Sequence, residues 1–87
     1  TEFNLMQNYP NPFNPSTNIR YSIPEASFVT IKVYDITGDE IITLVNEEKT
    51  SGLHQVEFDA SNLASGPYFY TIKTLKFSET KKMILMK

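Results

Sequence analysis

The chain of 87 residues is long enough for one small domain with a single hydrophobic core and too short for two domains. Hydrophobic residues make up 40% and aromatic residues 13% of the chain, which is typical of a globular domain. The lack of cysteine excludes disulfides, a thiolate nucleophile and a zinc site built from cysteines.

The net charge of -2 is distributed unevenly along the chain. Residues 1–72 contain three basic and nine acidic residues, whereas residues 73–87 contain five lysines and one acidic residue, Glu79. An acidic body with Arg20 as its only arginine would repel phosphates, so nucleic acid is not an expected partner. The basic end is typical of a solvated edge strand, where lysines discourage pairing with other sheets.

Apolar and polar residues alternate almost everywhere, which predicts an all-β chain. A first strand is expected near residues 3–6, and the segment NYPNPFNPST follows at residues 8–17. Each proline in this segment pushes the residue before it out of the helical region, so we predict a stiff, irregular arm. Its asparagine side chains can satisfy unpaired backbone groups, while Tyr9 and Phe13 can pin the arm to the rest of the domain.

The next strands are predicted at residues 17–23 (TNIRYSI), 27–35 (SFVTIKVYD) and 40–45 (EIITLV). Gly38, in the turn DITGD, supplies the positive-φ position of a tight hairpin between the last two. The alternation places Ile19, Tyr21 and Ile23 on one face of the first of these strands. It places Val29, Ile31 and Val33 on one face of the second.

Three further strands, at residues 54–59, 67–74 and 78–87, complete a count of about seven, which indicates an immunoglobulin-like sandwich of antiparallel strands. The segment NLASGPY, which contains Gly66 and Tyr68, is typical of the corner between the two sheets. There a tyrosine hydroxyl bonds a nearby backbone group.

Few residues are candidates for chemistry. His54 is the only histidine and could act as a general base near Asp59, but it begins an alternating strand and no nucleophile is paired with it. Asp35, Asp39 and Glu40 could bind calcium, although their spacing does not match a calcium loop and acidic residues are common in hairpin turns. The sequence predicts no enzyme, metal site or cofactor.

The aromatic residues offer an alternative function. Tyr34, Phe69 and Tyr70 could form a sugar-stacking platform, as in accessory carbohydrate-binding modules, although the core of a small sandwich claims most aromatic side chains. The alternative interpretation is therefore a carbohydrate-binding or spacer module attached to a secreted enzyme.

Four segments of the chain are specific in their order and spacing. They are NYPNPFNPST with IRYSIPE, VTIKVYDITGDEI, GLHQVEFDASNLASGPYFY and the terminal KKMILMK. In this order they resemble the C-terminal sorting domain of proteins exported by the bacterial type IX (Por) secretion system. That family lies within a wider group similar to the immunoglobulin-like domain of the flagellar hook-capping protein, and the resemblance covers essentially the whole chain.

The resemblance implies one C-terminal sorting domain over residues 1–87, with a proline- and asparagine-rich lead-in at residues 1–17 and the sandwich at residues 18–87. The lead-in would lie at the border with an upstream cargo protein. Because the chain begins with Thr1, we expect it to be a piece of a longer protein. The implied family motif comprises Asn8, Tyr9, Pro10, Asn11, Pro12, Phe13, Asn14, Pro15, Gly38, Gly66 and Tyr68.

The implied function is a non-catalytic signal that targets the cargo to the outer-membrane translocon and to surface attachment, where the domain is commonly replaced by a lipopolysaccharide anchor. Its expected partners are the translocon, the attachment machinery and the covalently linked cargo, without nucleic acid or a membrane span. Weak self-association through the terminal strand is a further expectation. The cargo would pass through the periplasm to the cell surface or the extracellular space.

The resemblance also implies that a terminal strand carries recognition. Its apolar residues are expected to alternate between the core and a partner, while its lysines complement an acidic receptor surface. The strand comprises Lys81, Lys82, Met83, Ile84, Leu85, Met86 and Lys87.

Overall fold

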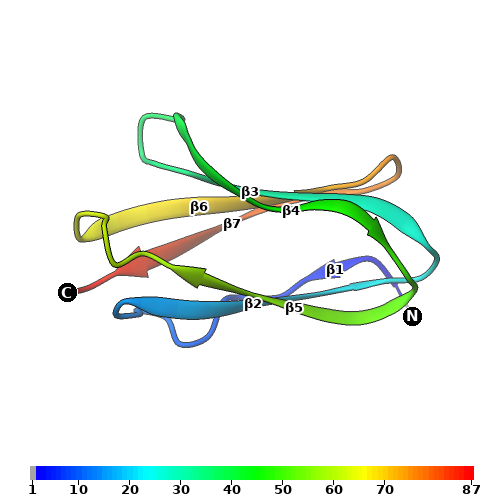
Figure 1. Cartoon of the computed structure of the whole chain (residues 1–87), viewed down its shortest axis with the longest axis horizontal. Coiled ribbons are helices and arrows are strands. Elements are labelled where there is room, and N and C mark those ends of the chain that lie inside the picture. Colours follow the sequence, from blue (N-terminus) through cyan, green and yellow to red (C-terminus); the bar gives the residue numbers. More distant parts are fainter. Residues whose placement is uncertain (1) are drawn as a thin grey trace.

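The computed structural model describes residues 2–87 as seven strands in two facing sheets (Figure 1). The three-stranded sheet has the order β1 (Asn4–Leu5), β2 (Ser16–Ile23), β5 (Gly52–Asp59). The four-stranded sheet has the order β4 (Glu40–Lys49), β3 (Ser27–Tyr34), β6 (Gly66–Lys73), β7 (Ser78–Leu85). All pairings between these strands are antiparallel, so the predicted all-β sandwich is confirmed. In the part of the chain that is described, no helix could cross a membrane.

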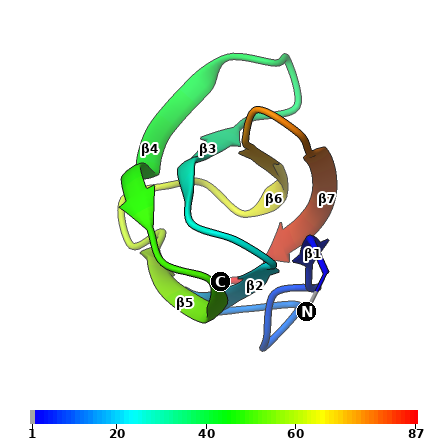
Figure 2. The ribbon, with the colours of Figure 1, turned by 90° about the vertical axis from the view of Figure 1, so that its right-hand side faces the viewer.

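The alternation of apolar residues buries one face of β2, β3 and β6 and the last part of β7 between the sheets. Figure 2 shows the two sheets facing each other from one end. The apolar side chains predicted to share one face of β2 and one face of β3 all point into the core and are at most 1% exposed. β6 and β7 lie in the same sheet as β3 and add Tyr68, Tyr70, Ile72, Met83 and Leu85 to the core. Removal of this apolar surface from water is the main force that holds the two sheets together.

The observed ends of most strands differ from the predicted ones by one or two residues, and β7 ends at Leu85 instead of the predicted Lys87. The differences in β4 and β1 are also notable. β4 continues to Lys49, beyond the predicted residues 40–45, because it pairs with β3 as far as Ser27. β1 is only two residues long. Gly38 has the predicted positive φ, at 91°, in a turn closed by the bond from Asp35 N to Asp39 O at 3.0 Å.

The corner between β5 and β6 also forms as predicted. The Tyr68 hydroxyl donates to the carbonyl oxygen of Ala64 at 2.6 Å, which is the tyrosine corner of immunoglobulin-like domains. β4, however, lies beside β3, whereas the fourth strand of constant-type immunoglobulin domains lies beside the strand that corresponds to β5.

The substitution Tyr68→Phe should lower the free energy of unfolding by about 1 kcal/mol, because it removes one largely buried hydrogen bond and keeps the ring in the core. Urea unfolding monitored by circular dichroism would measure this loss. Tyr9→Phe is the matched control, since Tyr9 is 75% exposed. Equal losses in both variants would contradict a structural role for the Tyr68 hydroxyl.

Candidate functional site

The opening segment, residues 8–15, connects β1 to β2 and packs on the end of the sandwich where β7 finishes (Figure 1). Its three X–Pro peptide bonds are cis. Phe13 pins the segment as predicted, since it is 2% exposed and its ring centroid lies 6.0 Å from that of Phe58. The same prediction is wrong for Tyr9, whose side chain is 75% exposed. Tyr9 contributes its backbone instead, which exchanges two hydrogen bonds with Asn18.

The opening segment pairs directly with the end of β7. Phe13 N donates to Ile84 O at 2.9 Å, and Met86 N donates to Phe13 O at 2.9 Å, which makes a parallel bridge between Phe13 and Leu85. The Asn11 carboxamide oxygen accepts from Ile84 N at 3.0 Å. The free edge of β7 is therefore covered at its C-terminal end, and the first and last family motifs form one structure.

Asn8 and Tyr70 tie this segment to the interior of the sandwich. The Asn8 carboxamide nitrogen donates to Pro10 O at 3.2 Å and to Thr17 Oγ1 at 3.1 Å, so the predicted role of asparagine side chains is confirmed for Asn8. The Tyr70 hydroxyl accepts from Asn8 N at 2.7 Å and donates to Met6 O at 2.7 Å. This hydroxyl therefore satisfies two backbone groups at the start of the opening segment.

Burial raises the pKa of Tyr70 to about 12. The folded state therefore keeps the phenol neutral at a pH where the unfolded chain begins to lose its proton. The stability from this group is fully present below about pH 10 and is lost as the pH rises through the folded pKa.

Tyr70→Phe should lower the free energy of unfolding by about 1–3 kcal/mol, because it leaves the buried Asn8 N–H without an acceptor. It should also weaken the fall in stability of the native chain between pH 10 and about pH 12. Urea unfolding at neutral and alkaline pH would measure both effects. If the variant matched the native protein at neutral pH, the hydroxyl would have no anchoring role.

In the predicted terminal strand, residues 81–87, only residues 81–85 belong to β7, and the side chains alternate between the core and solvent. Met83 and Leu85 are 0% and 1% exposed, whereas Met86 is 60% exposed and Ile84 is half-buried. The structure thus places one apolar pair in the core and leaves the other on the surface.

The three lysines of the terminal strand have different surroundings. Lys81 Nζ lies 3.3 Å from Glu79 Oε2, and Lys87 Nζ donates to Ser61 O at 2.7 Å. Lys82 is exposed, and its ammonium group makes no ion pair or hydrogen bond with the described residues 2–87. Lys82 therefore carries the freest positive charge on this strand.

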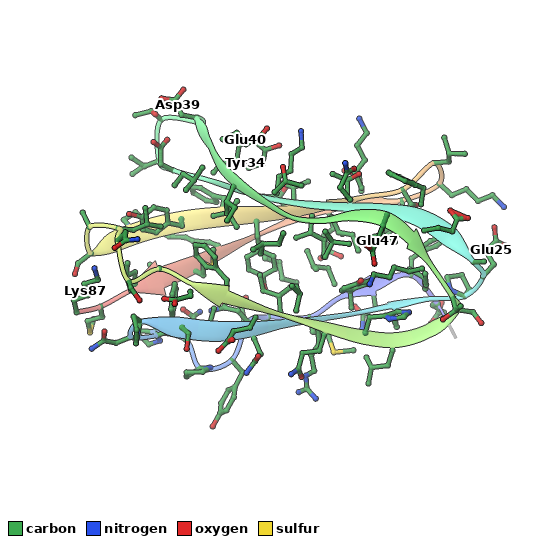
Figure 3. The ribbon with its side chains drawn as sticks, in the orientation of Figure 1. Glu25, Tyr34, Asp39, Glu40, Glu47 and Lys87 are labelled. Atoms are coloured by element: carbon green, nitrogen blue, oxygen red, sulfur yellow. The ribbon has the colours of Figure 1, made fainter. Side chains whose placement is uncertain are left out.

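The tyrosine corner belongs to the same end of the molecule. Lys87 N donates to Ser65 Oγ at 3.1 Å, directly before Gly66 at the start of β6. Gly38 is separate, because the neighbouring Asp39 and the terminal Lys87 lie well apart (Figure 3). The structure thus brings together every predicted motif except the Gly38 turn.

Sequence reasoning missed several residues that hold this end together. Gln7 Nε2 donates to the main-chain oxygen of Lys82 at 2.8 Å, and Thr17 Oγ1 donates to Pro10 O at 2.8 Å. Ser61 and Ser65 accept the two hydrogen bonds that Lys87 donates. Polar residues of these types are so common on surfaces that no signal in one sequence distinguishes them.

The candidates for chemistry have structural roles. His54 Nε2 lies 2.7 Å from Thr50 O, and its ring stacks on Tyr21 with centroids 5.4 Å apart. Asp59 accepts a hydrogen bond from Ser61 N at 2.9 Å. The histidine and this carboxylate thus serve local structure at opposite ends of β5.

The acidic residues near the β3–β4 turn are similarly engaged. Asp35 Oδ1 accepts from Thr37 N at 2.9 Å and from Asp39 N at 3.0 Å. Hydrogen bonding, above all from the Thr37 hydroxyl, lowers the pKa of Asp35. Glu40 pairs with Lys32 at 3.1 Å. Among the residues that the structure describes, no three acidic, histidine or cysteine side chains gather as a metal site would require.

The suggested sugar platform does not form. Tyr34 and Phe69 are opposite each other in the β3–β6 pairing and lie half-buried on the outer face of the sheet. Tyr70 has the opposite parity on β6 and is 0% exposed, so it cannot stack on a ligand. Of the three rings, only those of Tyr34 and Phe69 are accessible to a ligand, and both are half-buried.

The fold defines the class of protein as a small β-sandwich module, in which the opening segment and the last strand meet at one end. Residues 7–86 match the family described as secretion system C-terminal sorting domain. The chain belongs to this family of C-terminal sorting signals for type IX secretion, whose role is non-enzymatic. Such a tail marks proteins for export through the periplasm to the cell surface or the extracellular space. A search of curated proteins finds no match.

Proposed function

We propose that the export machinery recognises the end of the sandwich where the opening segment lies against the terminal strand. The main support is the pairing of Phe13 with Ile84 and Met86 through two backbone hydrogen bonds, both 2.9 Å long. This pairing presents residues 8–15 and residues 81–87 to a partner as one surface. In this proposal residues 1–87 act as one module, with the lead-in of residues 1–17 joined to the upstream cargo.

The proposed surface divides the terminal strand into two roles. Met83 and Leu85 anchor it in the core, while Lys82, Ile84 and Met86 face the partner. A translocon or attachment protein with an acidic and apolar surface would complement these three side chains. Lys81 and Lys87 take part only by exchanging their present contacts with Glu79 and Ser61, so they should contribute less.

Export of a reporter joined to the N-terminal end of the domain, in a host with the type IX machinery, tests this proposal. The variant Lys82→Glu with Met86→Asp should lower surface reporter by about tenfold or more, because it reverses one charge and places another in the interface. Leu53→Asp is the matched control, since Leu53 is 61% exposed on the other sheet.

Thermal unfolding of each purified variant would show whether the domain is still folded. Equal export from the double variant, the control and the native domain, all folded, would refute recognition at this end. Loss of export in the control alone would place recognition on the three-stranded sheet.

A further inference from the structure

An apolar notch lies at the end of the sandwich opposite to the candidate site, where the chain enters β1. It encloses about 210 Å³. Its walls come from the first residues of the chain, the β2–β3 connection with the start of β3, the end of β4 and the β6–β7 turn. They include the apolar Phe3, Phe28 and Leu75 and the charged Glu25, Glu48 and Lys76. Figure 3 places Glu25 at this end and Lys87 at the other, along a molecule whose longest extent is 37 Å.

The walls of the notch are held in place by specific contacts. The Phe3 and Phe77 rings stack with centroids 5.2 Å apart and an angle of 11° between their planes. Ser22 Oγ donates to Glu2 O at 2.9 Å, and Thr74 N donates to Phe77 O at 2.8 Å. The entering chain and the β6–β7 turn therefore have fixed positions on the rim.

The notch exposes more apolar surface than the fold requires. Phe28 is 53% exposed, and Leu75, at the tip of its turn, is fully exposed. Beside them, Lys76 Nζ lies 3.0 Å from Glu25 Oε2, so that a charged pair borders the apolar centre. An apolar centre with a polar rim is the usual composition of a protein interface, and exposed apolar residues gathered around a hollow indicate a binding surface.

We propose that this notch docks the cargo domain that directly precedes the sorting domain in the exported protein. The inference rests on family membership, because a C-terminal sorting domain follows its cargo, and it goes beyond the proposed recognition site. Phe3 lines the notch, and Glu2, the residue before it, is held by the bond from Ser22, so the upstream polypeptide leaves the domain beside the notch. Tethering gives the preceding domain a high effective concentration there, so a contact of a few apolar side chains is sufficient.

This docking would have a geometric consequence for export. The cargo would cover the end that contains Phe28 and Leu75, and the terminal strand would point away from it. The export machinery would then meet the candidate site without interference from the folded cargo.

Photo-crosslinking in the full-length exported protein tests the inference. The substitution Leu75→p-benzoylphenylalanine should give cross-links to the preceding domain, detected by mass spectrometry of the digested protein. Leu53→p-benzoylphenylalanine is the matched control. Leu53 is 61% exposed and pairs with Ser22 near the same end, but it lies on β5, away from the notch. The yield should be about fivefold higher at position 75, and Phe28→Ser should bring it down to the control level.

Equal yields at positions 75 and 53, or a yield at position 75 that Phe28→Ser leaves unchanged, would overturn the docking inference. Phe28→Ser should also leave surface export of the cargo unchanged. A loss of export from Phe28→Ser with its cross-links intact would assign the notch to the machinery instead. Failure of the proposed recognition site would be seen separately, as normal export of the Lys82→Glu, Met86→Asp variant.

Discussion

A chain that lacks residues 82–87 is expected to be largely unfolded at room temperature, because the deletion removes part of the fold as well as part of the signal. Met83 and Leu85 are 0% and 1% exposed, and truncation of each such side chain alone costs about 2–5 kcal/mol. The deletion also removes the partners of the Phe13 backbone. Together these losses approach or exceed the stability of an ordinary domain, about 5–15 kcal/mol.

Far-UV circular dichroism and urea unfolding of the truncated chain would measure the loss. The matched control lacks only residues 86 and 87, both exposed, and should remain folded with a modest decrease in the unfolding midpoint. A truncated chain with the native midpoint would show that the last strand is dispensable for folding. If the prediction holds, loss of export after truncation cannot by itself assign recognition to this strand, and surface variants such as Lys82→Glu become necessary.

The sandwich could be predicted from the sequence because period-two alternation determines which side chains face the core. Ile19, Tyr21 and Ile23 are all buried as the pattern of β2 predicts. Local chemistry also identified the Gly38 turn and the hydroxyl bond of Tyr68. Each of these features depends on residues close together in the chain, where backbone geometry restricts the possible structures.

For the candidate site, the sequence predicted the opening segment and the terminal strand separately but not their contact. The bridge between Phe13 and Leu85 joins segments at the two ends of the sequence, and alternation contains no information about which sheet edges meet. In the irregular opening segment alternation also fails to distinguish Phe13 from Tyr9, of which only Phe13 is buried. The sugar-platform hypothesis is wrong for Tyr70 because it does not use the parity that Tyr70 shares with Tyr68 on β6, where both side chains face the core.

Phe13→Ala is expected to lower the free energy of unfolding by about 3–5 kcal/mol, the usual cost of truncating a buried phenylalanine. The ring is 2% exposed and packs against Phe58 below the opening segment. Its loss leaves a cavity at the point where this segment covers the edge of β7. Since the Phe13 backbone also bonds Ile84 and Met86, the substitution should loosen the terminal strand.

Urea unfolding would measure the loss of stability, and hydrogen exchange of the Met86 amide would measure the loosening. Tyr9→Ala is the matched control, because Tyr9 is an aromatic residue of the same segment and is 75% exposed. Its effect on the free energy of unfolding should stay within about 0.5 kcal/mol. A Phe13→Ala variant with native stability would mean that the segment is not anchored by its ring. Normal stability with faster exchange at Met86 alone would instead limit the role of Phe13 to the backbone bridge. The expected combination, a large loss of stability with faster exchange, would make one buried ring the link between the first and last motifs of the sorting domain.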